Sequence, residues 1–136
     1  VIIGSRTLGG AEAGALSLPQ RVGNRVATWC MRLLYRVRVT DLGPFRCVDR
    51  AALNRLAMSD PTFGWTTELQ VKAYRLGLRI GEVPVTARVR TAGRSKIGGR
   101  LLPGLQAGWI ILRTIWRYHR CALPAVPDGR REGERA

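Results

Sequence analysis

The residues of this chain best suited to chemistry are its arginines, because a forked guanidinium can meet two phosphate oxygens at once. Lysines and arginines number 23 against 9 acidic residues, which gives a formal charge of +14. Such a charge favours polyanionic partners, namely nucleic acid, anionic lipid or phosphorylated ligands. Arg94, Ser95 and Lys96 lie together in a polar, glycine-rich segment over residues 91–100. We interpret this segment as a basic loop; taken alone, such a loop usually just faces solvent.

A second group of arginines lies along a helix that we predict over residues 21–38. Apolar residues recur there at helical spacing, and Pro19 stands just ahead, where helices tolerate proline. We expect Trp29, Leu33 and the other apolar side chains of this helix to pack in the core. A basic ribbon runs along the other face, the usual sign of a solvated surface. Its members are Arg21, Arg25, Arg32 and Arg36.

Further helices and strands must position these groups. Two short helices are predicted over residues 49–58 and 66–76, and two strands over 1–3 and 80–89. Asp49 is placed to cap the first of these helices, and Gly77 is placed to end the second. Pro84 indicates a sheet edge or the start of a strand. The pattern predicts a mixed α/β fold.

A further amphipathic helix is predicted over residues 105–120, where Trp109 and Trp116 share the helix with three arginines. Aromatic residues and arginines together suit a lipid interface. Arginines interrupt the apolar stretches well before the ~20 residues needed to span a bilayer, so we expect the chain to touch a membrane without crossing it. From residue 123 onward the composition lacks apolar anchors and predicts a disordered tail.

The cysteines point to neither metal nor disulfide chemistry. Cys30, Cys47 and Cys121 are odd in number and lack the close pairs of a zinc site. We therefore expect no disulfide framework, no metal cage and a reducing compartment. The chain opens on the apolar run Val1–Ile3 without an initiating methionine or a leader, from which we expect a fragment of a longer protein.

Four short motifs indicate a protein family more specifically when they occur in a fixed order along the chain than any of them does alone. They are the strand end Ile3–Arg6, the helix opening Arg21–Arg25, the TDLGPFR segment at 40–46 and the loop Gly93–Lys96. In this order they resemble the second half of the dolichyl-phosphate mannose synthases and related bacterial polyprenyl-phosphate glycosyltransferases. These are family 2 transferases with a GT-A fold, and the resemblance runs from Val1 to about Trp116.

The resemblance implies a truncated GT-A fold that supplies the acceptor side. Residues 1–100 would be the later half of the glycosyltransferase domain, 101–122 an amphipathic membrane-surface helix, and 123–136 the tail. The enzyme would be inverting, and it would pass a sugar from a nucleotide-sugar donor to a polyprenyl-phosphate acceptor. It would be peripheral, at the cytoplasmic face of the inner membrane. The preceding half of such enzymes holds Mg²⁺ or Mn²⁺, so this fragment alone is expected to bind no metal and to be inactive.

The resemblance assigns phosphates to two places. Arg94, Ser95 and Lys96 match the mobile G-x-S-K loop of the family, whose cations close over the donor diphosphate. Gln20 stands where the family leads us to expect a basic residue, so a neighbouring arginine is expected to substitute for it. The acceptor phosphate is assigned to Arg6, Arg21, Asn24 and Arg25.

Two carboxylates match catalytic positions of the family, and each has a structural alternative. Asp41 would face the sugar or the acceptor, and we favour positioning over proton abstraction because a phosphate is already anionic at neutral pH. Its alternative is a turn cap. Glu68 lies near the start of its helix, where the helix dipole alone would favour an acid. Arg46 is expected to pair with Asp41 or Asp49.

Two other classes of function compete with this interpretation. A basic nucleic-acid-binding module would bind phosphates with strong salt dependence. The chain has nine aromatic residues, and none of them clusters with arginine on a strand face as base stacking would require, so we do not expect nucleic acid as a partner. A non-catalytic membrane-surface protein would use the helix over residues 105–120, but it leaves the loop at 93–96 unexplained.

Overall fold

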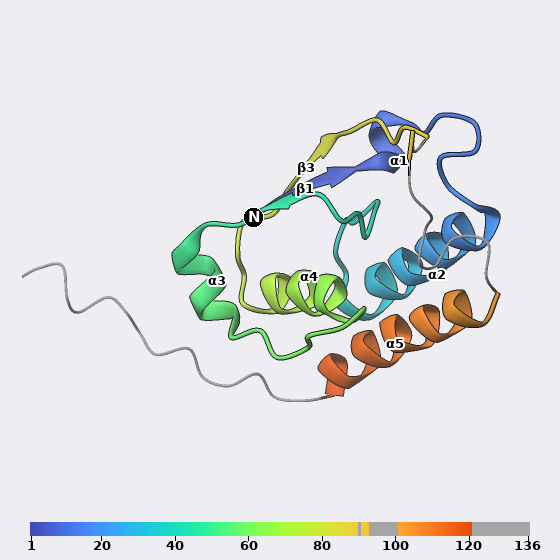
Figure 1. Ribbon diagram of the computed structural model, residues 1–136. Helices are drawn as coiled ribbons and strands as arrows, with labels where there is room; N and C mark the ends of the chain where they lie inside the picture. Colours follow the sequence, from blue (N-terminus) through green and yellow to red (C-terminus); the bar gives the residue numbers. More distant parts are fainter. Residues whose placement is uncertain (90, 93–100, 121–136) are drawn as a thin grey trace, which may run out of the picture.

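The computed structural model describes residues 1–89, 91–92 and 101–120; the basic loop at 93–96 and the tail from 123 lie outside these residues. A small sheet lies beside a group of helices (Figure 1), so the predicted α/β class is confirmed. In chain order the elements are β1 (Ile2–Ser5), α1 (Arg6–Gly9), α2 (Leu18–Tyr35), β2 (Arg46–Cys47), α3 (Arg50–Leu56), α4 (Trp65–Arg75), β3 (Gly81–Pro84) and α5 (Leu101–Arg120).

The central strand of the sheet is β1, and the strand order is β2-β1-β3. It runs antiparallel to β2 and parallel to β3, so that Ile3 lies opposite both Arg46 and Glu82. Side chains alternate between the two faces of a strand, and Ile3 and Ser5 are fully buried while Ile2 is exposed. One face of β1 is therefore buried, and the other is exposed at Ile2 but covered at Gly4, which is buried close to the side chains of Val85 and Phe45.

The strand predicted over residues 80–89 is shorter in the structure and ends at Pro84. Proline has no N–H for a ladder hydrogen bond, which agrees with its place on an edge strand. Beyond Pro84 the chain continues alongside the first ten residues. The Val85 amide donates to the carbonyl of Ser5 and the Ala87 amide to that of Gly10, both at 3.0 Å.

The bounds of the helices follow from local capping groups. Helix α2 begins three residues earlier than predicted, because the side-chain oxygen of Gln20 accepts a hydrogen bond from the Ser17 amide at 2.9 Å. It ends before Arg36, which adopts a left-handed conformation with φ of 54°. Helix α3 begins as predicted after Asp49, whose carboxylate accepts from the Ala52 amide at 3.0 Å.

Helix α4 ends in a Schellman motif centred on Gly77, as its sequence predicts. Gly77 has φ of +64° and donates to the Tyr74 carbonyl at 3.1 Å, and Leu78 donates to the Ala73 carbonyl at 3.0 Å. A left-handed conformation is available to glycine without the steric cost that a Cβ brings. The motif turns the chain from α4 into β3.

The main core lies where α2, α4 and α5 pack side by side (Figure 1). A second, smaller cluster around Leu56 and Leu69 joins α3 to α4. None of the helices in the described ranges has both the length and the apolar character needed to span a bilayer. The buried members of the main core are Ala27, Met31, Val39, Val71, Ile115 and Tyr118.

The prediction that Trp29 and Leu33 pack in the core is wrong. Their side chains are 61% and 63% exposed, respectively. The buried face of α2 is instead formed by small and polar side chains together with Met31, because close packing on α4 and α5 favours Ala27 and Thr28 there. An apolar pattern at helical spacing shows that a helix has an apolar face, but not what that face contacts.

Replacing Gly77 should test the end of α4. Gly77→Ala should lower the free energy of unfolding by about 1 kcal/mol, because alanine resists the left-handed conformation. The matched control is Gly23→Ala inside α2, where an added Cβ meets nothing within 4 Å; it should raise stability by up to about 1 kcal/mol. Urea denaturation of both variants measures this, and two changes of the same sign would contradict it.

Candidate active site

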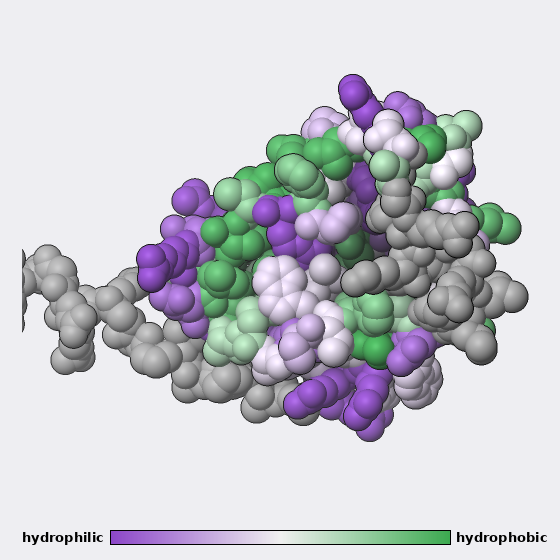
Figure 2. Space-filling model, viewed as in Figure 1, coloured by the Kyte–Doolittle hydropathy of each residue, from purple (hydrophilic) through white to green (hydrophobic). Residues whose placement is uncertain are grey.

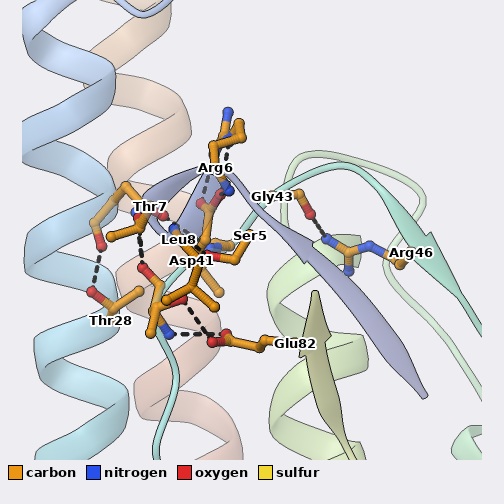
Figure 3. Close-up of polar contacts among 12 residues, drawn as sticks. Ser5, Arg6, Thr7, Leu8, Thr28, Asp41, Gly43, Arg46 and Glu82 are labelled. Carbon is orange, nitrogen blue, oxygen red and sulfur yellow. Dashed lines mark hydrogen bonds and ion pairs between the residues drawn. The ribbon is translucent and has the colours of Figure 1, made fainter. Parts of the chain in front are cut away.

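The centre of the candidate site is an ion pair at the junction of β1 and α1. Arg6 donates from Nε and Nη2 to the two carboxylate oxygens of Asp41 at 2.8 and 2.7 Å, and its backbone amide donates to Oδ2 at 2.8 Å (Figure 3). The Asp41 side chain is 1% exposed and that of Arg6 is 22% exposed. The hydrogen bonds to Asp41 raise the pKa of Arg6, although burial acts in the opposite direction. Arg6 is therefore a fixed, fully charged group.

The residue before Asp41 is held just as firmly. The two oxygens of the Glu82 side chain accept from the Thr40 amide at 2.9 Å and from its hydroxyl at 2.6 Å (Figure 3). The same hydroxyl lies 2.6 Å from that of Ser5, and the Thr7 hydroxyl donates to the Thr40 carbonyl at 3.0 Å. Strands β1 and β3 thus fix Thr40 together with the start of α1.

Glu82 is the residue of this cluster that the sequence analysis missed. Its only signal is the register of β3, which places it opposite the buried Ile3. Register is a property of strand pairing and cannot be read from one strand alone. The pairing of β3 with β1 is what places Glu82 beside Thr40.

Asn24 of α2 also holds this segment. Its side-chain oxygen accepts from the Leu42 amide at 2.9 Å, and its nitrogen lies 3.4 Å from the Thr40 carbonyl. Arg21 and Arg25, within one helical turn of Asn24, are exposed. The structure therefore brings three of the four predicted acceptor residues onto one helix beside Asp41, and the fourth, Arg6, onto Asp41 itself.

The turn after Asp41 requires a glycine. A Cβ at Gly43 would lie 2.6 Å from the Gly4 carbonyl oxygen and 3.1 Å from Oδ2 of Asp41, and real side chains do not approach backbone so closely. The Gly43 carbonyl in turn accepts a hydrogen bond from Arg46 (Figure 3). The Gly-Pro pair of the TDLGPFR segment thus allows the chain to pass close against β1.

The predicted pairing of Arg46 with Asp41 or Asp49 is wrong, because its guanidinium donates to backbone carbonyls instead. Besides Gly43, its partner is the Thr66 carbonyl at 2.9 Å, and its charge lies 5.6 Å from the ring centre of Trp65. Burial lowers the pKa of Arg46 to about 10, although the nearby charge of Asp41 raises it. Arg46 therefore remains charged at neutral pH and ties β2 to α4.

Glu68 is a second buried carboxylate, at some remove from the first. It is fully buried in α4 and accepts from Tyr118 at 2.6 Å, from the Ser59 hydroxyl at 2.7 Å and from the Asp60 amide at 2.8 Å, with Lys72 at 2.7 Å. Burial acts to raise its pKa, but these hydrogen bonds outweigh it and lower the pKa to about 2.

The contacts of Glu68 join α4 and α5 to the loop before α4. They explain an acid at this position without any substrate, so they support a positioning role, and the catalytic role that the family resemblance implies stays a prediction. Gln70, on the same helix, reaches the Asp41 backbone carbonyl at 3.1 Å. Helix α4 therefore supports both carboxylates from one rigid element.

The described residues contain no group of three histidine, cysteine, aspartate or glutamate side chains that could hold a metal ion. The predicted donor-side residues Arg94, Ser95 and Lys96 lie outside the described ranges. The structure thus covers the acceptor-side part of the predicted site. Its chemistry is that of a cationic surface, positioned by buried carboxylates, which can meet an anion.

Comparison with known proteins points to the glycosyltransferases as a class. The chain is 40% identical over 97 residues, 71% of its length, to an uncharacterized glycosyltransferase of Mycobacterium bovis and to uncharacterized glycosyltransferases of two strains of Mycobacterium tuberculosis. The aligned part is 43% of each relative, so the chain spans less than half the length of these relatives. No protein-family model matches the chain, and no solved structure matches it.

Removing the carboxylate of Asp41 should show how much the fold relies on the ion pair. Asp41→Asn leaves Arg6 without its partner in a largely buried position, so the free energy of unfolding should fall by about 3 kcal/mol. The matched control is Asp49→Asn at the exposed start of α3, where asparagine caps as well as aspartate. Equal losses for the two variants in urea denaturation would show that Arg6–Asp41 is not a buried pair.

Glu68 should make the stability depend on acid pH. Its pKa in the folded state, about 2, lies below the ordinary 4.5, so it stabilises the fold above pH 4.5 and this contribution is lost as the pH falls toward 2. The stability difference between the wild type and Glu68→Gln should shrink by about 3 kcal/mol between pH 5 and pH 2. Chemical denaturation across this range measures it.

A second variant checks the cause of that pH dependence. Tyr118→Phe removes one hydrogen bond to the carboxylate, so the pKa of Glu68 should rise and the loss should be complete at a higher pH. An unchanged pH profile in this variant would mean that Tyr118 does not stabilise the charged form.

Proposed function

We propose that this chain is the acceptor-side half of an inverting glycosyltransferase with a GT-A fold, which passes a sugar from a nucleotide-sugar to a polyprenyl phosphate. The observation that carries the proposal is the 40% identity to mycobacterial proteins named glycosyltransferases. The ordered motifs and the geometry around Asp41 support its finer parts. In this proposal Mg²⁺ or Mn²⁺ would be held with the donor by residues other than those described, and no step below passes through the metal.

Arg6 and Asp41 would recognise the acceptor phosphate together. A guanidinium has five N–H donors, and Asp41 uses only two of those of Arg6. The carboxylate fixes the plane of the guanidinium, and the partly exposed remainder would meet a phosphate without reorganising. Arg21 and Arg25 would add charge from α2, which offsets the neutralisation of Arg6 by Asp41.

The acceptor needs no catalytic base on this side. A polyprenyl phosphate is anionic at neutral pH, and its oxygen can attack the sugar carbon directly. Asp41 is poorly placed for proton abstraction, because its side chain is only 1% exposed and both of its oxygens accept hydrogen bonds from Arg6. Its role is therefore to position Arg6, and catalysis would rest on the orientation of two anionic substrates.

On the donor side, Arg94 and Lys96 would act with Ser95 on the diphosphate. Negative charge builds up on the diphosphate as the sugar bond breaks, so cations that close over it stabilise the transition state more than the bound donor. The enzyme would work as a peripheral protein at the cytoplasmic face of the inner membrane, where its acceptor lies. The exposed Trp109 and Trp116 of α5 support contact with a lipid surface.

The proposal can be tested by assaying the protein in its full-length form. A panel of radiolabelled nucleotide-sugars is offered together with a short polyprenyl phosphate, and label that moves into the organic phase is counted. Transfer of at least one sugar is expected. Transfer to a soluble acceptor only would overturn the polyprenyl-phosphate assignment. The absence of both transfer and donor hydrolysis with every nucleotide-sugar in the panel would overturn the enzyme class.

Lys96→Ala should lower turnover by roughly a hundredfold in that assay, with little change in donor binding, because the lost contact acts mainly in the transition state. The matched control is Arg79→Ala, an exposed cation near the start of β3, which should leave turnover within about twofold. Near-normal turnover of Lys96→Ala would place the loop in solvent, and a change in the acceptor Michaelis constant alone would make it an acceptor clamp.

A further inference from the structure

Helix α2 presents a continuous apolar stripe to solvent. Five apolar residues of α2 form this stripe. They recur every three or four positions, so they fall on one side of the helix at about 100° per residue. That side lies opposite the face that Ala27 and Met31 bury in the core. The stripe consists of Leu18, Val22, Val26, Trp29 and Leu33, which are from 42% to 74% exposed.

Helix α5 continues this apolar surface. It lies beside α2 (Figure 1), and Leu105, Trp109 and Trp116 are exposed on it at similar spacing. Between the two helices runs an apolar groove of about 430 Å³. The groove joins the two stripes into one surface, which we call the α2–α5 face. It is lined by Cys30, Leu34, Trp109, Leu112, Arg113, Ile115 and Trp116.

Arginines border this face along both long edges. On α2, the helical spacing places Arg21, Arg25 and Arg32 on the side of the stripe away from α5. On α5, three exposed arginines flank the apolar stripe, and one of them, Arg113, also lines the groove. Figure 2 shows hydrophilic side chains along the lower edge of the molecule, over α5. Neither helix contains an aspartate or a glutamate. The arginines of α5 are Arg113, Arg117 and Arg120, and the last lies 4.5 Å from the Trp116 ring centre.

We propose that the α2–α5 face docks on an anionic lipid bilayer, with both helices lying in its surface. This deepens the proposed function, since it assigns α2, and not α5 alone, to the membrane contact of that enzyme. An exposed apolar area with aromatic residues, flanked by cations, gains from burial among acyl chains and from attraction to anionic headgroups. Here both contributions come from one surface.

Charge is what favours a bilayer over a second copy of the chain. Two copies joined through this face would bring their arginine borders together, and the face offers no acidic residue to pair with them. Each copy also carries a formal charge of +14, so repulsion would oppose the dimer. An anionic surface instead attracts each arginine that lies near it.

The orientation that follows has a use for the reaction. Around α2, Arg21 and Arg25 lie between the apolar stripe and Asn24, which contacts the Asp41 segment. When the stripe enters the acyl region, these two arginines come to the level of the headgroups. Arg6 and Asp41 then lie just above the membrane surface, where the phosphate of a lipid acceptor would be found.

The test uses tryptophan fluorescence of the full chain with vesicles of phosphatidylcholine containing about one third phosphatidylglycerol. Brominated phosphatidylcholine quenches tryptophans that enter the acyl region. Each test variant keeps Trp65, which stacks with Arg46 away from the face, and one face tryptophan, with the remaining ones changed to phenylalanine. A reference variant keeps Trp65 alone. Trp29 and Trp109 should both be quenched, whereas a variant with Trp65 alone should not.

Two pairs of surface variants test the two forces separately. Leu33→Ser should weaken vesicle binding about tenfold. Phe45→Ser, at an apolar residue beside the sheet that is even more exposed than Leu33, should change it little. Arg113→Gln should weaken binding about fivefold, while Arg55→Gln on α3 should change it less. All four residues are exposed, so their replacement leaves the core intact.

The proposal fails if the chain does not bind these vesicles, or if Trp109 is quenched and Trp29 is not, which would leave α5 as the only membrane contact. It also fails if light scattering shows a dimer that Leu33→Ser dissociates while vesicles do not bind, because the face would then be a protein interface. None of these measurements involves sugar transfer, so a failure here leaves the enzyme class untouched, and an inactive enzyme leaves the docking surface untouched.

Discussion

The ion pair between Arg6 and Asp41 is the contact on which the other parts of this structure depend, because it brings a charged carboxylate out of water at the point where several elements meet. A buried charge must be paired and fully hydrogen-bonded, or the fold loses several kcal/mol. Three donors of Arg6 meet this demand. The demand also fixes the neighbours: β1 must end beside the segment at 40–46, Gly43 must lack a side chain, and α2 must bring Asn24 alongside.

The two buried carboxylates show how one physical problem is solved for different ends. Glu68 is surrounded by donors from its own helix, from α5 and from the preceding loop, and no part of it reaches solvent. Asp41 pairs with an arginine whose side chain is still partly exposed. In the first arrangement, the carboxylate interacts only with groups inside the fold. The second passes its orienting effect to a cation that a ligand can reach.

Local signals in the sequence predicted much of the secondary structure. The cap at Asp49, the end of α4 at Gly77 and the α/β alternation depend on neighbours within a few residues, so a single sequence contains them. Glu82 and Arg46 depend on contacts between elements, and sequence alone did not place either beside its partners. The predicted burial of Trp29 and Leu33 was wrong for a related reason. Hydrophobic periodicity indicates an apolar face, whereas burial depends on which helix packs against which side. The ordered motifs placed Arg6, Asn24 and Asp41 in one site through family resemblance, and the structure brings them together.

The parallel pairing of β1 with β3 has a consequence for the order in which the chain folds. Ile2 pairs with Gly81, about 80 residues later, so the first strand leaves the ribosome long before its partner exists. Contacts between such distant segments form late, because a long loop must close before they contribute. Until then, the apolar side chains of β1 are exposed in a nascent chain of high positive charge, in addition to the α2 stripe, which stays exposed in the folded protein. The repulsion between its arginines then keeps neighbouring nascent chains apart during the interval in which they would otherwise aggregate.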